Sequence, residues 1–196
     1  MDDRARLAAW REGDGAAGEA LIHAHYGAVL RFFRSKACED ADDLVQQTFL
    51  RTLEHADRFR GDASFRSFLF GVARNVLFEH YRAKVRSGRP PPDFGVSSIL
   101  DLEPRASTLL FRRAEERALV QALQGMPVEL QIVLELYYWE ELSVDEVAAA
   151  VEVPPGTVKS RLFRGRQLLR EALERDPSGL LGPEGADGLM RAARPD

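Results

Sequence analysis

The sequence predicts an all-α protein with two small helical domains, an N-terminal helical bundle and a C-terminal helix-turn-helix domain, joined by a flexible linker. Apolar residues recur every three or four positions along most of the 196-residue chain, which is the period of an amphipathic helix. No segment shows the sustained alternation that is typical of a strand. Residues 88–105 are rich in Gly, Pro and Ser, and their three consecutive prolines cannot continue a helix.

The first domain, residues 1–87, is expected to hold four helices. Apolar spacing predicts them over residues 4–12, 16–36, 41–56 and about 64–86. The stretch Gly13–Gly15 separates the first two helices. An acidic stretch, Glu39–Asp43, introduces the third helix and suits the positive end of its dipole.

The second domain, residues 106–175, is predicted to end in a helix-turn-helix. Helices are expected over about 106–123 and 127–139. The capping box at Ser143–Glu146 opens a third helix, and after a short turn a fourth helix begins within 153–157. A tail rich in Gly and Pro, residues 176–196, follows the domain.

The last helix has the build of a major-groove reading helix. At about 100° per residue, Val158, Leu162 and Leu169 fall on a docking side, opposite a polar side with an exposed phenyl ring. Base edges are expected to be contacted by Ser160 and Arg164, a thymine methyl group or sugar by Phe163, and phosphates by Lys159, Arg161 and Arg166. The alternative is an amphipathic surface helix whose arginines are merely solvated.

The helix over residues 64–86 interleaves aromatic rings with arginine, a combination that suits unpaired bases. Rings and guanidinium planes stack on bases, while cations follow the backbone. The side expected to face away from the core carries Ser67, Phe70, Arg74, Phe78 and Tyr81, with Asn75 and Arg82 at its edge. The alternative is an aromatic helix packed on two sides, which would bury Phe70 and Tyr81.

The helix over residues 41–56 offers a candidate surface for docking a protein. Val45, Phe49 and Leu53 are expected to face inward, with Leu44 at the margin. The outward side combines an exposed leucine with amide and charged groups, at Asp43, Gln47, Leu50, Arg51 and Glu54. An ordinary solvated face would show the same spacing.

Charge is unevenly distributed along the chain, whose net charge is −4. Residues 58–89 carry eight Lys or Arg and two Asp or Glu, and residues 157–175 carry six and two. In contrast, residues 121–156 carry seven acidic residues and no Lys or Arg. Two basic segments in an acidic protein predict weak DNA binding by the chain alone, and stronger binding once a partner supplies affinity.

Signals for catalysis, for a cofactor or for a metal are poor. The four histidines form no HExxH motif, and there is no phosphate-cradling glycine loop. A single cysteine, Cys38, cannot form an internal disulfide or a cysteine zinc site. We therefore expect no enzyme activity, no cofactor and no metal. The charged N-terminus lacks an apolar signal core and no apolar run reaches about 18 residues, so we expect a cytoplasmic protein.

Three segments resemble the extracytoplasmic-function (ECF) group of the sigma-70 family. The group's polymerase-docking helix and the loop after it are similar to ADDLVQQTFLRTLEHADRFRGDASF, residues 41–65. The segment that opens the −10 promoter element is similar to FRSFLFGVARNVLFEHYRAKVR, residues 65–86. The −35-reading motif is similar to LSVDEVAAAVEVPPGTVKSRLFRGRQLLREAL, residues 142–173. With the N-terminal helices, the resemblance covers about residues 5–175.

The resemblance implies a bacterial sigma factor that binds core RNA polymerase and directs it to promoters through a duplex −35 element and a melted −10 strand. Docking to the clamp helices of the largest polymerase subunit is implied for Asp43, Leu44, Gln46, Gln47 and Phe49, although the family more often has Glu at position 47. Capture of a flipped −10 base is implied for Phe59, Gly61, Asp62 and Phe65, and Asn75 matches an asparagine near the −10 element. The −35-reading positions match Lys159, Ser160, Phe163 and Arg164.

The family also favours an anti-sigma protein as a further partner. Two other readings remain. A stand-alone helix-turn-helix regulator would dimerise and bind duplex DNA without polymerase, but it does not need the aromatic, basic stretch Phe59–Arg86. A helical interaction protein would bind acidic partners and ignore DNA, but it does not need the capped turn before Val158.

Overall fold

The computed structural model describes residues 2–59, 61, 63–87, 114–174 and 190. In these residues the regular structure is helical, which confirms the predicted all-α class. The first helical group comprises α1 (Asp3–Arg11), α2 (Gly15–Arg34), α3 (Ala41–Glu54) and α4 (Phe65–Arg86). The second helical group comprises α5 (Ala114–Gln124), α6 (Val128–Tyr138), α7 (Val144–Val151) and α8 (Pro155–Glu174). The predicted linker, residues 106–113 and most of the predicted tail lie outside the described residues.

Side-chain caps set where several helices begin. The carboxylate of Asp2 accepts a hydrogen bond from the amide of Ala5 at 2.8 Å, and Asp14 accepts one from Ala17 at 3.1 Å. Ser64 caps α4 in the same way, through the amide of Ser67 at 3.3 Å. None of the described helices is both long and apolar enough to cross a membrane.

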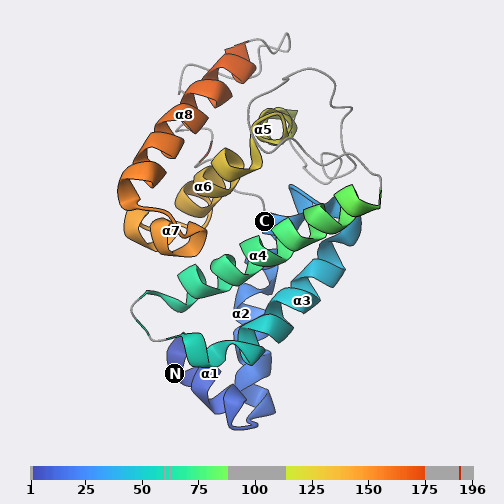
Figure 1. Cartoon of the computed structure of the whole chain (residues 1–196), viewed down its shortest axis with the longest axis vertical. Helices are drawn as coiled ribbons and strands as arrows, with labels where there is room; N and C mark the ends of the chain where they lie inside the picture. The colour runs from blue at the N-terminus through green and yellow to red at the C-terminus, as the bar shows by residue number, and fades with distance from the viewer. Residues whose placement is uncertain (1, 60, 62, 88–113, 175–189, 191–196) are drawn as a thin grey trace.

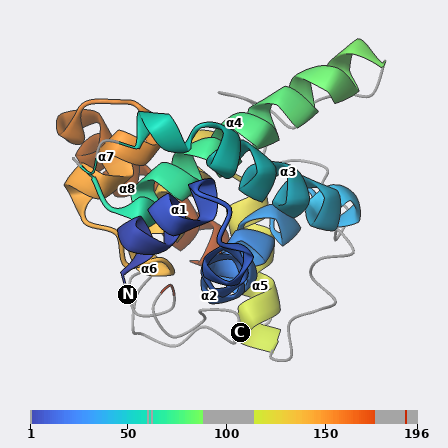
Figure 2. The same ribbon diagram turned by 90° about the horizontal axis from the view of Figure 1, so that it is seen from below.

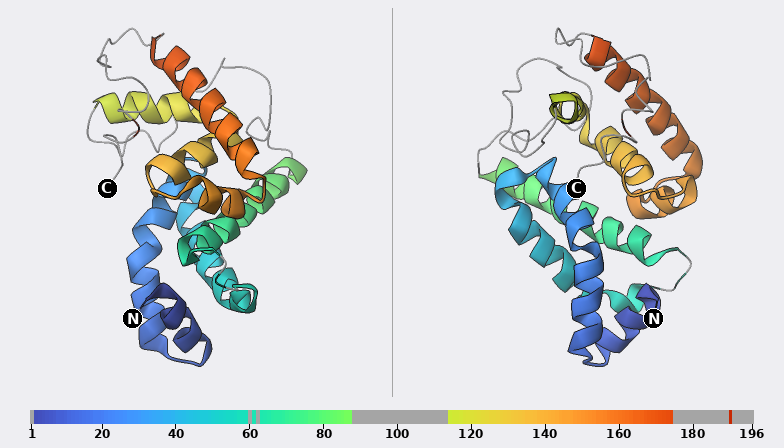
Figure 3. Two further views of the ribbon diagram at one scale, coloured as in Figure 1. Left: turned by 90° about the vertical axis from the view of Figure 1, so that its left-hand side faces the viewer. Right: turned by 180° about the vertical axis from the view of Figure 1, so that it is seen from behind.

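Helix α4 lies at the boundary of the first helical group, between α3 and the second helical group (Figure 1). Helices α2 and α3 contact it on one side and α7 contacts it on the other. Seen from two further directions, α1–α3 lie at one end of the molecule and α5, α6 and α8 at the other (Figure 3). Seen from below, the C-terminal end of α4 extends beyond the helices that pack on the rest of it (Figure 2).

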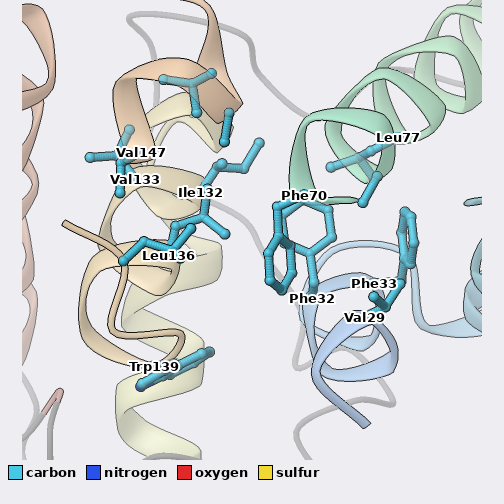
Figure 4. Close-up of a cluster of buried hydrophobic side chains, with 14 of the residues drawn as sticks. Val29, Phe32, Phe33, Phe70, Leu77, Ile132, Val133, Leu136, Trp139 and Val147 are labelled. Carbon is cyan, nitrogen blue, oxygen red and sulfur yellow. The ribbon is translucent and has the colours of Figure 1, made fainter. Parts of the chain in front are cut away.

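Because α4 is packed on two sides, part of the side that was predicted to face away from the core is buried. Phe70 is 0% exposed, and Ser67 and Tyr81 are also buried. Phe70 lies against the second helical group (Figure 4), as does Ser67, whose hydroxyl donates to the carbonyl of Glu146, while the Tyr81 hydroxyl donates to the carbonyl of Lys36 at 3.1 Å. The placement of these three side chains on a DNA-facing side is therefore wrong, and the alternative of a helix packed on two sides holds.

The buried apolar side chains of both helical groups form one continuous cluster. Phe32 of α2 and Phe70 of α4 face Ile132 and Leu136 of α6 across the boundary (Figure 4). At the far end of α6, the indole of Trp139 donates to the carbonyl of Met190 at 2.9 Å. The sequence did not predict that the two groups share a core.

Candidate nucleic-acid and polymerase-docking surfaces

The helix-turn-helix is built by the caps that the sequence predicts. Ser143 and Glu146 form the capping box of α7. Glu152 ends α7 in a left-handed conformation with φ 55°, and α8 begins at Pro155, inside the predicted window. A Cβ atom at Gly165 would lie 3.0 Å from a methyl group of Leu134, so α6 and α8 approach closely at this glycine.

The outer side of α8 is open to solvent, as predicted. Phe163 is 68% exposed, which is unusual for a phenyl ring. The side chains around it that are also exposed are Lys159, Ser160, Arg164 and Gln167, whereas Val158, Leu162, Gly165 and Leu169 are buried. Among the described residues, no ion pair engages Lys159 or Arg164, so both cations are available to DNA.

Two arginines predicted to contact phosphates are less free. Arg161 is half-buried at the flank of α8. Arg166 is also half-buried and donates to the hydroxyl of Tyr138 at 3.2 Å, which ties it to α6. Arg166 would have to exchange this contact for a phosphate, so we expect a smaller contribution to DNA affinity from it than from Lys159.

A hollow beside α4 brings together several of the residues predicted to bind the −10 strand. The first helical group lines it with Arg58, Phe59, Gly61, Phe68 and Asn75, among others, and we call it the α4 hollow. The Phe59 and Phe68 rings lie 5.4 Å apart at 32°, which gives the hollow an aromatic wall. Gly61, which also lines the hollow, has φ 82°, a conformation that favours glycine. An aromatic wall with an amide and a guanidinium group suits a flipped base.

The other predicted −10 residues have different places. Phe65 is buried between the rings of Phe59, at 6.0 Å, and His25, at 5.3 Å, so it supports Phe59 from the core. Arg74 is half-buried, with its guanidinium 4.9 Å from the centre of the Phe78 ring. Arg82 is exposed about two turns further along α4. Asp62 lies outside the described residues.

Helix α3 presents a mixed surface on the outside of the first helical group. Asp43, Gln46 and Gln47 are exposed beside Leu50, which is 61% exposed. Leu44 is buried together with Phe49, because α3 packs against both α2 and α4. The placement of Leu44 at the margin is therefore wrong, and both residues act by holding α3.

Leu50 is a surface residue that the family resemblance did not assign. Helical spacing places it outward, where it adds apolar area to the amide and carboxylate groups of α3. A cross-helix contact fixes the neighbouring turn, since Arg51 pairs with Glu79 of α4 at 2.6 Å.

Two family models match the chain, and each lies within one helical group. The model described as Sigma-70 region 2 matches residues 21–87, and the model described as Sigma-70, region 4 matches residues 116–169. Region 2 therefore contains α3, α4 and most of the lining of the α4 hollow, while region 4 contains the helix-turn-helix.

Known sigma factors are similar along nearly the whole chain. The RNA polymerase sigma-H factor of Pseudomonas aeruginosa is 30% identical over 179 residues, which cover 84% of this chain and 90% of that protein. The ECF RNA polymerase sigma-E factor of Escherichia coli is 27% identical over 183 residues, covering 86% and 93%.

Two solved structures share the arrangement of helices. CnrH, in complex with the cytosolic domain of CnrY, superposes with a TM-score of 0.67 at 27% identity and covers 89% of this chain and 98% of that one. The sigma factor RpoE of Bartonella quintana, in complex with the anti-sigma factor NepR, has the same fold, with a TM-score of 0.62 at 21% identity over 81% and 97% of the chains.

Both matched regions, together with the similarity to known sigma factors, make this helical protein a transcription initiation factor. The chain belongs to the ECF group of the sigma-70 family and directs RNA polymerase to promoters. A stand-alone helix-turn-helix regulator is not favoured, because it leaves the region 2 match over residues 21–87 without a role.

Proposed function

We propose that three surfaces of this sigma factor each carry out one step of promoter recognition. The outer side of α8 reads the duplex −35 element, the α4 hollow captures a base of the melted −10 strand, and α3 docks core RNA polymerase. The observation that carries the proposal is the exposed side of α8, where Phe163 is 68% exposed beside two cations that no ion pair engages within the described residues. We also propose the domain boundaries 1–87, 88–105, 106–175 and 176–196, which the positions of the two family matches support.

Recognition of the −35 element rests on α8. Arg164 can donate two hydrogen bonds to a guanine edge, and Ser160 can bond to a neighbouring base. Phe163 supplies apolar contact to a thymine methyl group. Lys159 and Arg161 take phosphates, with Arg166 as a weaker contributor because Tyr138 holds it.

Capture of the −10 strand rests on the α4 hollow. Unstacking a base costs a few kcal/mol, and an aromatic wall offsets part of this cost by stacking. Phe59 supplies the wall and Asn75 supplies hydrogen bonds, while Gly61 shapes the loop. We assign Arg74 and Arg82 to the strand's phosphates, and Asp62 keeps the role that the resemblance implies.

Docking to core polymerase rests on the exposed side of α3. Asp43, Gln46 and Gln47 offer hydrogen bonds and charge, and Leu50 offers an apolar centre. Leu44 and Phe49 contribute by fixing α3 in the core. We propose the clamp helices of the largest polymerase subunit as the partner, and an anti-sigma protein as a second partner that holds the chain in the cytoplasm. The chain is proposed to have no catalytic activity of its own.

Run-off transcription tests this division of labour. Purified core polymerase is combined with a set of candidate promoter fragments, with and without the chain. We expect transcripts with defined start sites only when the chain is present. Binding of duplex fragments by a homodimer of the chain, with no effect on polymerase, would contradict the proposal and support a stand-alone regulator.

A further inference from the structure

Helix α1 reaches the edge of the α4 hollow, although it precedes the part of the chain that the region 2 model matches. A Cβ atom at Gly61 would lie 2.5 Å from Nη1 and 2.8 Å from Cζ of Arg4, so the guanidinium group of Arg4 lies directly over this glycine. Gly61 in turn lines the hollow. A cation of α1 therefore lies beside the site that we propose for the flipped −10 base.

Packing holds α1 in this position. Leu7 is 2% exposed, and α1 packs on α2. A Cβ atom at Gly18 of α2 would lie 2.5 Å from the indole of Trp10, so this ring lies flat against the backbone of α2. Helix α1 also contacts the η2 turn (Ala56–Arg58), where Arg11 pairs with Asp57 (Figure 3). Both ends of α1 are therefore fixed relative to the hollow.

A second connection leads from α1 to the aromatic wall of the hollow. The carboxylate of Asp3 lies 2.8 Å from Nε2 of His25. The His25 ring lies 5.3 Å from the ring of Phe65, and that ring lies 6.0 Å from the ring of Phe59. The first turn of α1 and the wall of the hollow are thus parts of one packed unit, and Arg4 belongs to that first turn.

Arg4 differs from the other arginines of α1. Arg6 pairs with Asp3 at 3.2 Å and Arg11 pairs with Asp57. Arg4 is exposed, and no ion pair within the described residues engages it. A guanidinium group is always charged and can bind a phosphate through two parallel hydrogen bonds. Arg4 thus has the chemistry and the exposure that a phosphate contact needs.

The path of the DNA strand brings phosphates to this edge of the hollow. A flipped base rotates about its own backbone, so the phosphates on either side of it stay outside the pocket. Arg74 and Arg82, which we assign to phosphates, both lie on α4. Arg4 approaches from the Gly61 side instead. The strand would therefore have a cation from a second element next to the captured base.

We propose that Arg4 binds a backbone phosphate next to the captured −10 base, so that α1 is part of the −10 site. The inference rests on the proposed function of the α4 hollow. A phosphate contact adds affinity without reading the sequence, and the affinity that it adds weakens with salt. Arg4 therefore supports binding of the melted strand whatever its bases are, whereas Asn75 supports the base that enters the hollow.

Salt-dependent binding of the holoenzyme tests this inference. The probe is a fluorescent fragment of a promoter that gives run-off transcripts, duplex upstream and single-stranded through the −10 element. The variants are Arg4→Ala, Arg4→Lys and, as a charge-matched control, Arg34→Ala, at an exposed position at the other end of α2. Fluorescence anisotropy at several salt concentrations gives the affinity and its salt dependence.

We expect Arg4→Ala to bind the probe about three- to tenfold more weakly at low salt. The slope of log affinity against log salt concentration should fall in magnitude by about 0.7, which is the value for one phosphate of a single strand. Arg4→Lys should keep most of the affinity and the slope, because the charge is retained. Arg34→Ala should match the unmodified chain. Since Arg4 is exposed, its replacement should leave the melting temperature of the free chain unchanged.

Two results would overturn the inference. The first is an Arg4→Ala variant that binds the probe as tightly as the Arg34→Ala control. The second is a loss of affinity with an unchanged salt slope and no rescue by Arg4→Lys, because Arg4 would then hold the Gly61 stretch in place without binding a phosphate.

Asn75→Ala separates failure of the inference from failure of the proposed function. If Asn75→Ala impairs promoter opening while Arg4→Ala has no effect, the hollow keeps its role and only the phosphate contact is wrong. If neither variant affects binding or opening, the hollow does not bind the −10 strand, and both the inference and the proposed function of the hollow fail.

Discussion

Helices α8 and α4 both carry an aromatic, basic side, yet they present it in opposite ways. On α8 that side faces solvent, with Phe163 68% exposed. On α4 much of it is enclosed, because α7 packs on it and Phe70 is 0% exposed. The same residue types therefore form a solvent-exposed surface on α8 and part of the buried contact between the helical groups on α4. The number of packed neighbours, rather than composition, decides which role a side chain takes.

The largest expected effect is a difference in stability between variants that lack one of the two phenyl rings, Phe70 or Phe163. Phe70→Ala removes a fully buried ring and should lower the free energy of unfolding by about 3–5 kcal/mol. Phe163→Ala removes an exposed ring and should change it by no more than about 0.5 kcal/mol. Chemical denaturation of both variants measures the difference. Similar losses of stability would mean that the two sides are not packed differently.

The next effect concerns the open surface of α8. Arg164→Ala should weaken binding of the holoenzyme to −35 duplex by about 1–3 kcal/mol, since a base contact is lost, while the affinity for core polymerase stays unchanged. Arg170→Ala makes the same charge change on an exposed position of the same helix and serves as the control. Fluorescence anisotropy with duplex promoter fragments measures both. Loss of polymerase binding by a folded Arg164→Ala variant would contradict the division of labour.

A smaller effect is expected in the α4 hollow. Asn75→Ala should reduce promoter opening about tenfold, because one hydrogen-bonding group for the captured base is lost, and should leave polymerase binding intact. Permanganate reactivity of unpaired thymines measures opening, and a pull-down with core polymerase measures docking. An equal loss in both assays would count against the role of Asn75.

The smallest effect concerns the cap that begins α7. Hydrogen bonds from the Ser64 side chain and the Ser143 backbone hold the pKa of Glu146 below its ordinary value. A carboxyl group with a depressed pKa stabilises the folded state above its unfolded pKa, and this contribution is lost as the pH falls through the folded pKa. Glu146→Gln should therefore cost about 0.5–1 kcal/mol at neutral pH and less in acid. Denaturation of the wild type and of Glu146→Gln at pH 7 and at about pH 3 checks this. If the two proteins differ in stability by the same amount at both pH values, ionised Glu146 is not involved.

The sequence predicted α8 well because only one of its sides is packed. Its apolar residues then follow the helical period, and Val158, Leu162 and Leu169 are buried as expected. For α4 the same reasoning misplaced Phe70, since the period identifies one packed side and cannot show that a distant helix covers the other. The errors at Ser67 and Leu44 have the same origin, because neighbours on two sides bury both residues.

The contacts between the helical groups could not be predicted from local patterns. Lys36 and Glu135, which form a buried ion pair between the groups, are 99 residues apart, and each by itself resembles an ordinary surface charge. The contrast in charge between residues 58–89 and 121–156 did not identify this pair, because Lys36 lies outside both segments. For the hollow, the family resemblance named Phe59, Gly61 and Asn75, and the structure brings these three together.

The reactivity of a single thiol on each helix tests most directly whether the side of α8 is exposed and the corresponding side of α4 is enclosed. Ser160→Cys and Ser67→Cys make the same small change on the two helices, in a Cys38→Ser background. Ser160 is exposed, whereas Ser67 is 1% exposed and bonded to α7. We predict that Ser160→Cys reacts with a thiol reagent like a free cysteine and that Ser67→Cys reacts about a hundredfold more slowly or less. Similar rates at the two positions would contradict the difference in packing between α8 and α4.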